Sequence, residues 1–345
     1  MDQLNKQYIL IKGKAGLGNR IMVLLDSLIY ADLSGRKPII DWCDGAYAPY
    51  GVNAFPLLFS EPSVGNIQPL TLADSVTPGT WKGHLQKSVD KLFQEIYPFN
   101  DEMDTVRCVA RRYTIDTRKI SYSETFAVRW GWTHELHNLR RFFHGPYKKY
   151  FFLSDNEILR SVLKEQVRPV EEIQTCVKAF CDEFFNDSVI GLHIRHSDRK
   201  NSYDGYFKYV DRFLSEHPFG VVFISTDNSD VEYSFKSRYP RVVASEKWYP
   251  PPGMPIHRNR QPERDMLRNA REALIELYLL GSCNSLIFNS TSTFGCLASL
   301  LSGAPSANIV DMAPWSFRRS VKCFVSLLQN IIPISYSAVF KYCSR

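Results

Sequence analysis

Short apolar runs alternate with helical patterns along the second half of the chain. The apolar runs predict strands at 188–195, Val221–Ile224, Val242–Val243 and Leu286–Asn289. Helical patterns follow at about 206–216, from about Val231, from about Glu263 to Leu280, and up to Gly303-Ala304-Pro305. Strands that alternate with helices predict a mainly parallel sheet covered by helices. We therefore expect a doubly wound α/β domain in this half.

The first half opens with the same alternation. Tyr8–Ile11 is a predicted strand, and after a glycine-rich turn Ile21–Leu33 is a predicted helix that ends at Ser34-Gly35. Pro38–Trp42 is the next predicted strand. Residues 43–150 are rich in Pro and aromatic residues and show no clear period, whereas 153–185 is helical except at Pro169. In a chain of 345 residues we expect two domains, 1–175 and 176–345.

The segment Gly191–Arg199 ends a buried strand with side chains suited to a nucleotide phosphate. His193 and Arg195 share one face of this strand, opposite the apolar Leu192. In open α/β sheets, ligands bind just outside the carboxyl ends of the strands. An arginine at that place can make paired, charge-assisted bonds to a diphosphate. The alternative is a strand-end arginine bonded to nearby carbonyl groups.

A glycine turn, Gly13-Lys14-Ala15-Gly16-Leu17-Gly18, links the first strand to the first helix. Its spacing is neither the dinucleotide G-x-G-x-x-G nor a P-loop. Glycine nevertheless lets the backbone approach a ligand closely, and a helix N-terminus attracts anions. Gly16 and Gly18 are therefore candidate ligand-binding residues at an anion site, and Asn19 and Arg20 add hydrogen-bond donors from their side chains. The alternative is a tight turn with a surface arginine.

Four hydroxyl residues, Ser290-Thr291-Ser292-Thr293, lie between a predicted strand and the start of a helix. They can cap the helix, or their hydroxyls and the helix N–H groups can bind phosphate. One of them is expected to cap the helix in either case. Because four hydroxyls exceed what a cap needs, we expect this segment to bind a ligand.

Two acidic side chains accompany these motifs. Glu276 falls in the apolar helical run Ala273–Leu280, where a carboxylate must be paired or hydrogen-bonded. The N1–H and 2-amino groups of a guanine are one such partner; the alternative is an exposed face shared with Glu272, one turn away. Asp227, in Thr226-Asp227-Asn228, ends another strand at the same rim, where it caps the next helix or shapes the site.

Composition limits the function classes. The net charge of +6 fits an anionic small molecule or an anionic membrane surface, and no basic tail, zinc-finger spacing or ribonucleoprotein motif indicates nucleic acid. Eight scattered cysteines without a C-x-x-C pair predict reduced thiols rather than disulfides or a zinc site.

We expect a cytoplasmic protein, because neither a signal peptide nor a membrane-spanning run is visible. The basic and apolar stretch Phe317–Cys343 fits packing across both domains, or contact with an anionic membrane at its inner face.

Motifs of other enzyme classes are absent. No D-x-D pair, which holds a divalent ion in metal-dependent sugar transferases, lies at a strand end. No H-E-x-x-H, G-x-S-x-G or Cys/His nucleophile pattern occurs either. We therefore expect no bound metal, and a departing phosphate must be neutralised by a fixed cation and by helix N-termini.

Taken together, the motifs resemble those of a known family. Its three conserved blocks are matched by His193-x-Arg195-His196-x-Asp198, by Thr226-Asp227-Asn228, and by Glu276 followed by Ser290–Thr293. This set resembles the α1,6-fucosyltransferases, above all the nodulation-protein fucosyltransferases, with the protein O-fucosyltransferases more distant. The turn Gly16–Arg20 resembles their N-terminal loop.

The resemblance implies a fold and an activity. The implied fold is that of a GT-B-type glycosyltransferase: two Rossmann-like domains with the active site in the cleft between them. The implied reaction is metal-independent, inverting transfer of fucose from GDP-fucose to a hydroxyl of an oligosaccharide or glycoconjugate. Two alternatives stay open: a transferase of this fold that uses another nucleotide sugar, and a non-catalytic protein that binds glycan or nucleotide.

The resemblance also implies roles for individual residues. Arg195 would hold the β-phosphate of the donor, Asp198 would orient Arg195, and His196 beside them is the third catalytic candidate. His193 would lie against the nucleoside, and Ser292 with its neighbours would bind the diphosphate.

Three positions depart from the family pattern. Glu276 replaces a guanine-binding Asp, and His196 stands where the longer α1,6 enzymes carry a second Arg, although the nodulation enzymes share the His. Tyr203, next to Asp204, stands where those longer enzymes carry a carboxylate proposed as the base. The sequence names no acceptor.

Overall fold

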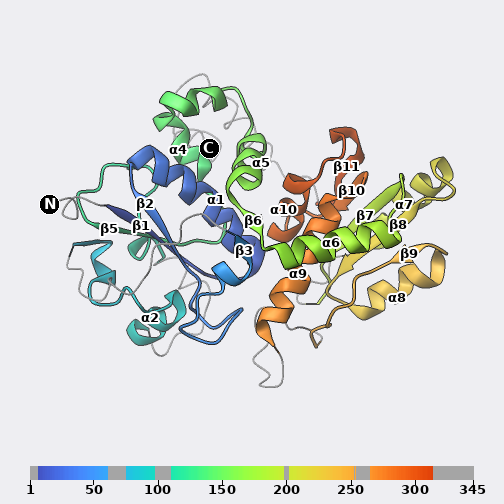
Figure 1. Ribbon diagram of the computed structural model, residues 1–345, viewed down its shortest axis with the longest axis horizontal. Helices are drawn as coiled ribbons and strands as arrows, with labels where there is room; N and C mark the ends of the chain where they lie inside the picture. Colours follow the sequence, from blue (N-terminus) through green and yellow to red (C-terminus); the bar gives the residue numbers. More distant parts are fainter. Residues whose placement is uncertain are drawn as a thin grey trace, which may run out of the picture.

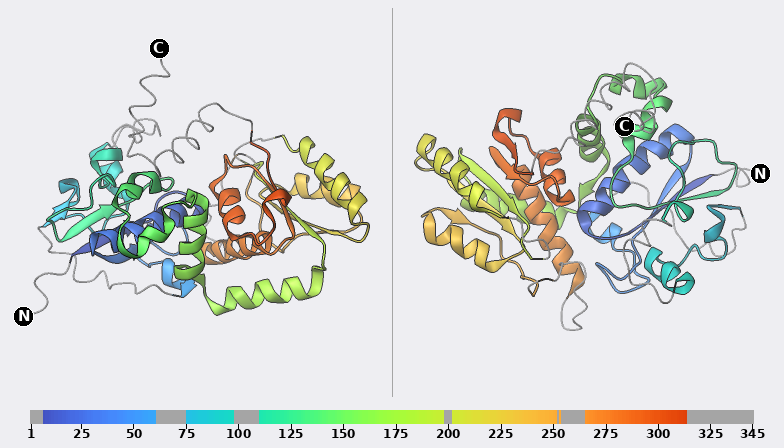
Figure 2. Two further views of the ribbon diagram at one scale, coloured as in Figure 1. Left: turned by 90° about the horizontal axis from the view of Figure 1, so that it is seen from above. Right: turned by 180° about the vertical axis from the view of Figure 1, so that it is seen from behind.

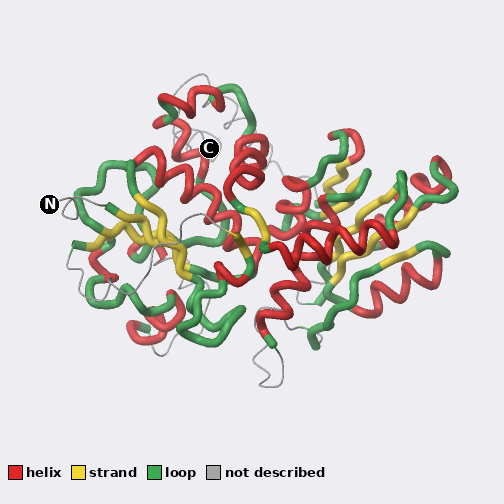
Figure 3. The backbone as a smooth tube through the Cα atoms, viewed as in Figure 1, coloured by secondary structure: helices red, strands yellow, loops and turns green. Residues whose placement is uncertain are grey.

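The structure is a computed structural model that describes residues 7–60, 75–97, 110–197, 202–251, 253 and 265–313. Two α/β lobes lie side by side along the long axis of the molecule, one for each half of the chain (Figures 1 and 2). Each lobe is built on its own sheet, with helices against its faces (Figure 3). The predicted architecture of two α/β lobes is confirmed, while the boundary between residues 175 and 176 stays a prediction.

The first lobe contains a four-stranded parallel sheet in the order β2-β1-β5-β4. Its strands are β1 (Tyr8–Lys12), β2 (Lys37–Asp41), β4 (Val76–Thr77) and β5 (Phe126–Arg129). Alternate side chains of β1 face opposite sides, so Ile9 and Ile11 pack with α1 (Leu17–Ser34), and Leu10 packs with α2 (Val89–Ile96). Both faces are thus covered, which explains why Ile9, Leu10 and Ile11 are all apolar.

Helix α1 begins at Leu17, four residues before the predicted start at Ile21. Gly18 and Asn19 are weak helix formers, so the sequence did not indicate that the first turn of the helix includes them. The predicted end is confirmed, because Gly35 closes α1 with a φ of 67° in the left-handed region. As a consequence, Asn19 and Arg20 lie on the first turn of a helix instead of in a loop.

Residues 43–150 form short elements packed by aromatic side chains. Trp81 and Trp130 are fully buried in the apolar cluster that includes α2, and Trp42 is buried on the α1 side, where it meets Phe55 and Phe59 edge to face. The short elements are η1 (Phe55–Leu57), β3 (Phe59–Ser60), η3 (Gly79–Trp81), η4 (Ala110–Arg112), α4 (Leu136–Leu139), η5 (Arg140–Phe142) and η6 (Gly145–Tyr150). Such elements are too short to show a period in the sequence.

Two helices make the passage between the lobes. Helix α5 (Asp155–Gln166) starts with a capping box between Ser154 and Glu157. Pro169 interrupts the helical run as predicted, within the short strand β6 (Arg168–Pro169), which pairs with β3. Helix α6 (Glu171–Phe184) then runs along α9 (Met266–Gly281) of the second lobe (Figure 1).

The second lobe contains a five-stranded parallel sheet in the order β11-β10-β7-β8-β9. Its strands are β7 (Val189–Ile194), β8 (Val221–Thr226), β9 (Val242–Val243), β10 (Ser285–Phe288) and β11 (Ile309–Asp311). The further helices are α7 (Asp204–Glu216), α8 (Ser229–Arg238) and α10 (Thr293–Leu301). The predicted strands and helices are confirmed apart from small differences at their ends. This is the doubly wound order, in which the winding reverses between β7 and β10.

An apolar core joins the two lobes. One continuous buried cluster includes Leu28 of α1, Leu159 of α5 and Leu297 of α10. Helix α5 also binds the end of α10, because Arg160 donates from Nε to the carbonyl oxygen of Leu300 (3.0 Å) and from Nη2 to that of Ser299 (3.1 Å). The lobes therefore meet through packed helices, with α10 at the centre.

Candidate functional site

The strand order places the predicted site where the lobes meet. In the second lobe the crevice at the reversal is flanked by the residues that follow β7 and β10. These are Arg195–Ser197, which directly follow His193 and Ile194 at the end of β7, and Ser290–Thr293, so the structure brings the two predicted segments together. In the first lobe β1 and β5 are neighbours, and the glycine turn and the loop 130–135 follow them.

The start of α10 is open at this crevice. Ser292 is its N-cap residue, but no side chain makes a capping hydrogen bond, so the expectation that one of the four hydroxyls caps the helix is wrong. The Ser292 hydroxyl is buried and has no hydrogen-bond partner within the described part of the chain. The Thr291 hydroxyl donates to Asn289 (2.8 Å), and the Ser290 N–H donates to Asp311 (2.9 Å). Uncapped N–H groups at a helix N-terminus are a ready anion site.

The start of α1 abuts the start of α10. A Cβ on Gly18 would lie 2.8 Å from both the backbone nitrogen of Phe294 and the hydroxyl of Thr293. Gly16 is the N-cap residue of α1 and, like Ser292, offers no side-chain cap. Two uncapped helix N-termini therefore face one another across the junction of the lobes, and both carry positive partial charge.

This close approach makes Gly18 a test of the junction. Gly18→Ala should destabilise the protein by about 1–3 kcal/mol, because backbone atoms would have to move apart to admit the methyl group. Urea unfolding measures the loss. Gly79→Ala is the matched control, because a Cβ there meets nothing within 4 Å. Equal midpoints for Gly18→Ala and the parent protein would contradict this packing.

Asn19 ties three segments together at the junction. Its side-chain amide donates to the carbonyl oxygen of Trp132 and accepts from the Thr293 hydroxyl (3.2 Å). Trp132 belongs to the loop after β5, and Thr293 starts α10. Asn19 therefore acts as a bridge between lobes, and its predicted role in donor binding stays a prediction.

Arg20 is committed to the glycine turn itself. Its guanidinium donates to both carboxylate oxygens of Asp44 and to the carbonyl oxygen of Ala15 (2.9 Å), and it lies over the rings of Trp42 and Tyr47. The alternative of a surface arginine is wrong, because Arg20 is buried. In this structure Arg20 supports the turn, and its predicted role in donor binding stays a prediction. Sequence reasoning missed Asp44 because it lies 24 residues away from Arg20.

Tyr47 is a further residue that the sequence did not indicate. It is buried, and burial raises the pKa of its hydroxyl to about 12. The positive charge of Arg195 acts in the opposite direction on the same hydroxyl. The first lobe thus places a neutral phenol within electrostatic range of the predicted catalytic arginine of the second lobe.

The end of β7 has the predicted alternation. Leu192 and Ile194 pack into the apolar cluster with α7 and α8, whereas the His193 ring stacks on Phe294 of α10 with centroids 5.2 Å apart. Burial, together with the positive charges of Arg195 and Lys247, lowers the pKa of His193 to about 3. The ring is therefore neutral at physiological pH. Its Nδ1 atom is buried without a hydrogen-bond partner among the described residues.

Asp227 holds the loop that carries His196. Its carboxylate accepts from the backbone N–H groups of His196 (2.6 Å) and Ser197 (3.0 Å) and from the Ser197 hydroxyl (2.6 Å). Asn228 caps α8 by accepting from Val231 N–H (3.0 Å). Local structure thus explains why Asp227 and Asn228 follow Thr226 at the end of β8. Asp227 positions the loop after β7, and Asn228 caps α8. Asp198 lies outside the described residues.

Glu276 is buried and paired. Its carboxylate accepts from the hydroxyls of Ser225 (3.1 Å) and Ser245 (3.1 Å) and forms an ion pair with Lys247. The alternative of an exposed face shared with Glu272 is therefore wrong. Burial raises the pKa of Glu276, and the charge of Lys247 opposes that shift. Lys247 was missed because nothing in its local sequence shows that it meets a carboxylate 29 residues away.

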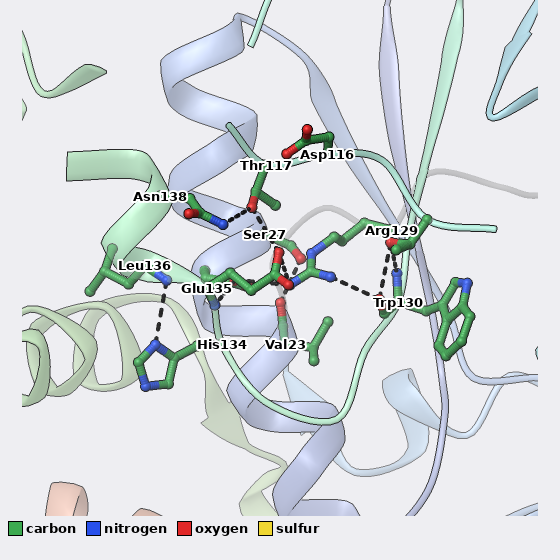
Figure 4. Close-up of polar contacts among 12 residues, drawn as sticks. Val23, Ser27, Asp116, Thr117, Arg129, Trp130, His134, Glu135, Leu136 and Asn138 are labelled. Atoms are coloured by element: carbon green, nitrogen blue, oxygen red, sulfur yellow. Dashed lines mark hydrogen bonds and ion pairs between the residues drawn. The ribbon is translucent and has the colours of Figure 1, made fainter. Parts of the chain in front are cut away.

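The loop after β5 is anchored along α1 by an ion pair (Figure 4). Arg129 donates from Nη2 to Asp26 (3.0 Å) and from Nη1 to the carbonyl oxygen of Trp130 (2.8 Å). Asp26 also accepts from the N–H of Glu135 (2.6 Å), whose carboxylate accepts from Thr117 (2.7 Å). This network fixes the loop after β5, which contains Trp132.

Among the described residues, no group of three or more His, Cys, Asp and Glu side chains could hold a metal ion. Five of the cysteines lie in the described ranges, and all five are free. No helix in those ranges is long and apolar enough to cross a membrane.

Two curated proteins are similar to this chain over most of its length. No protein-family profile matches the chain. The nodulation protein Z of Azorhizobium caulinodans is 23% identical over 319 residues, which cover 85% of this chain and 88% of that protein. The nodulation protein Z of Sinorhizobium fredii is 23% identical over 318 residues, which cover 84% of this chain and 88% of that protein.

Solved structures show the likeness in three dimensions. The NodZ α-1,6-fucosyltransferase soaked with GDP-fucose superposes with a TM-score of 0.59 at 19% identity, over 86% of this chain and 93% of that one. POFUT1 in complex with GDP-fucose superposes with a TM-score of 0.51 at 11% identity, over 90% of this chain and 98% of that one. The chain thus has the GT-B-type fold of these enzymes. Sequence and fold together confirm that the chain resembles the nodulation-protein fucosyltransferases, as its motifs indicated.

Proposed function

We propose that the chain is an inverting glycosyltransferase that moves L-fucose from GDP-fucose to a hydroxyl of a glycan acceptor. The observation that carries the proposal is the meeting of two uncapped helix N-termini, those of α1 and α10, at the crevice beside Arg195. A departing nucleoside diphosphate develops negative charge on its β-phosphate. Helix N-termini and a fixed guanidinium stabilise that charge. The relatives that the chain resembles include structures with GDP-fucose and GDP.

Each residue of the donor site has a proposed task. Arg195 and the α10 N-terminus, with Ser290–Thr293, bind the diphosphate, and Gly16 and Gly18 let the α1 backbone approach it. The neutral ring of His193 lies against the nucleoside. This role agrees with its stacking on Phe294 and with its unpartnered Nδ1 atom.

The pair formed by Glu276 and Lys247 would read the base. A carboxylate accepts from guanine N1–H and the 2-amino group, while an ammonium group donates to guanine O6. Adenine presents the opposite pattern at these positions, so the pair favours guanine. The serines that bond Glu276 hold its carboxylate in place.

The proposed reaction is a single displacement. The acceptor hydroxyl oxygen bonds to the anomeric carbon on the face opposite GDP, and the bond from that carbon to the phosphate oxygen breaks. The electron pair of that bond stays on the β-phosphate, next to Arg195. The hydroxyl proton passes to a carboxylate or histidine at the acceptor side. The candidates are His196 and Asp198, which follow Arg195 by one and three residues in the sequence.

The acceptor site would lie in the first lobe. The loop after β5 presents the half-buried Trp132 at the junction, and its backbone is one Asn19 side chain away from Thr293. An aromatic face next to the donor phosphates suits an oligosaccharide or glycoconjugate acceptor. Fixed cations take the place of a divalent ion in this mechanism, and we propose that it operates in the cytoplasm without metal.

Thermal stabilisation by nucleotides tests the donor. GDP and GDP-fucose should stabilise the protein with a chelator present, by about 2.7 kcal/mol at a hundredfold excess over Kd, because ligand binds the folded state alone. Differential scanning fluorimetry with GDP, GDP-fucose, GDP-mannose and UDP measures the shifts.

The outcomes separate the alternatives. A shift with UDP but not GDP would contradict the donor assignment and favour a transferase for another nucleotide sugar. A shift with GDP, but neither hydrolysis nor transfer across an acceptor screen, would favour a non-catalytic binding protein. Shifts that vanish with the chelator would contradict metal independence.

A further inference from the structure

The segment from Leu136 to Ser154 is basic and aromatic and lies away from the donor site. Its nineteen residues contain no Asp or Glu but include two arginines, two lysines and six Phe or Tyr residues. Figure 1 shows it as the light green segment between α4 and α5, at the upper edge of the first lobe. Neither the fold core nor the donor site accounts for its outward side chains.

One side of the segment is fixed in the protein. Phe143 and Tyr150 are buried in the core that joins the lobes, and Arg140 is buried in an ion pair with Asp155 (2.6 Å). The backbone is therefore held on a rigid base. What remains on the outside is the basic–aromatic face, which we define as Arg141, Lys148, Lys149, Phe151 and Phe152.

Local geometry brings the charges and the rings of this face together. Side chains three residues apart eclipse one another in a 3-10 helix. The 3-10 helix η6 ends at Tyr150, and its last bond runs from Phe151 N–H to the carbonyl oxygen of Lys148 (3.2 Å). Lys148 is thus next to Phe151, while the Lys149 ammonium lies over the Tyr150 ring, 4.8 Å from its centroid. The Phe151 and Phe152 rings lie 6.4 Å apart.

The rings of this face are costly to leave in water. Phe152 is 87% exposed and Phe151 37%, which makes Phe152 the most exposed large apolar side chain in the described part of the chain. A single exposed apolar residue is ordinary. Two adjacent exposed phenylalanines flanked by lysines are the pattern of a surface that enters a membrane interface.

The surroundings of the face are also positive. Arg141 donates to the carbonyl oxygen of Arg118, and Arg118 and Lys119 are both exposed. The nearby carboxylates are engaged: Asp116 with Arg118, Asp32 with the Tyr147 hydroxyl (2.6 Å), and Glu165 with Ser161 (2.7 Å).

We infer that the basic–aromatic face docks the protein on an anionic phospholipid surface. Lys148, Lys149 and Arg141 would pair with lipid phosphates, while Phe151 and Phe152 enter the boundary between headgroups and acyl chains. This inference does not depend on the proposed transfer reaction. It assigns membrane contact to this face rather than to Phe317–Cys343, which lies outside the described residues.

Vesicle co-sedimentation with the full chain tests the inference. The protein should bind phosphatidylcholine vesicles that contain about one quarter phosphatidylglycerol, and bind pure phosphatidylcholine vesicles much more weakly. Binding should weaken as salt rises, because salt screens the lysines. Lys148→Gln with Lys149→Gln should weaken partitioning by about 30-fold, and Phe152→Ser by about tenfold.

Matched variants keep the test specific. Phe219→Ser removes a phenylalanine that is 73% exposed on the second lobe, beside Arg241, and Lys208→Gln removes an exposed lysine there. Both should bind vesicles like the parent chain. Three outcomes would overturn the inference: no vesicle binding, equal binding to neutral and anionic vesicles, or unchanged binding after substitution of Lys148 and Lys149. An acidic protein partner for this face would give the first outcome.

Discussion

Arg195→Ala should lower the rate of sugar transfer by about 10²–10³-fold or more, while the fold stays intact. The side chain is half-buried at the end of β7, at the crevice where α1 and α10 begin. Without it, the charge that develops on the β-phosphate loses its proposed cationic partner and keeps only the neutral donors of the helix N-termini and of Ser290–Thr293. The measurement is the turnover of GDP-fucose with an acceptor found by screening, together with thermal unfolding of the variant.

Two further variants sharpen this result. Arg195→Lys keeps the charge but loses the paired donors, so its rate should fall between those of the parent and the alanine variant. Arg212→Ala is the control, because Arg212 is exposed and pairs only with Glu216 on the same helix among the contacts described for it. Near-normal turnover in Arg195→Ala would contradict the assignment of the site.

Arg129→Met should cost about 3–5 kcal/mol of the free energy of unfolding. The side chains of Arg129 and Asp26 are 2% and 0% exposed, so removal of the cation leaves a buried carboxylate without its counter-charge. Burial already raises the pKa of Asp26, and the charge of Arg129 is the largest effect that opposes it. Urea unfolding, followed by circular dichroism, measures the loss.

A double variant shows whether the loss of stability in Arg129→Met comes from the unpaired buried carboxylate of Asp26. Asp26→Asn with Arg129→Met removes both charges and keeps an oxygen that can accept from Glu135 N–H, so it should recover much of the lost stability. Arg118→Met is the exposed control, because its pair with Asp116 lies in water and should contribute no more than about 1 kcal/mol. If Arg129→Met unfolds at the parent's urea concentration, the ion pair is not what anchors the loop after β5.

The second lobe could be predicted from the sequence because its strands are buried on both faces. Such strands form continuous apolar runs, and the helices between them bury one side. The segments of the proposed donor site could also be located from local sequence. His193 and Arg195 follow from the alternation of a single strand, and Ser290–Thr293 from the junction of a strand and a helix. These are local relations, readable over a few residues.

The missed residues depend on contacts between distant segments. Asn19 meets Thr293 across 274 residues of sequence, and Lys247 meets Glu276 through the order of the strands. The elements of residues 43–150 could not be predicted, because short 3-10 turns and aromatic packing take the place of long periodic helices and strands there. Local sequence shows that Glu276 needs a partner, but only the assembled sheet shows which one.

Helix α10 is held at both ends by the rest of the molecule. Its first residue meets Asn19 of α1, and its last carbonyl groups meet Arg160 of α5. Nine residues make a strut about 14 Å long, so any change in the angle between the lobes tilts the helix whose N-terminus is proposed to hold the diphosphate. If α10 holds the diphosphate as proposed, donor affinity and lobe angle are linked reciprocally. A bound donor would then brace the two lobes, and a substitution of Arg160 at the far end of α10 would change nucleotide affinity without a contact to the nucleotide.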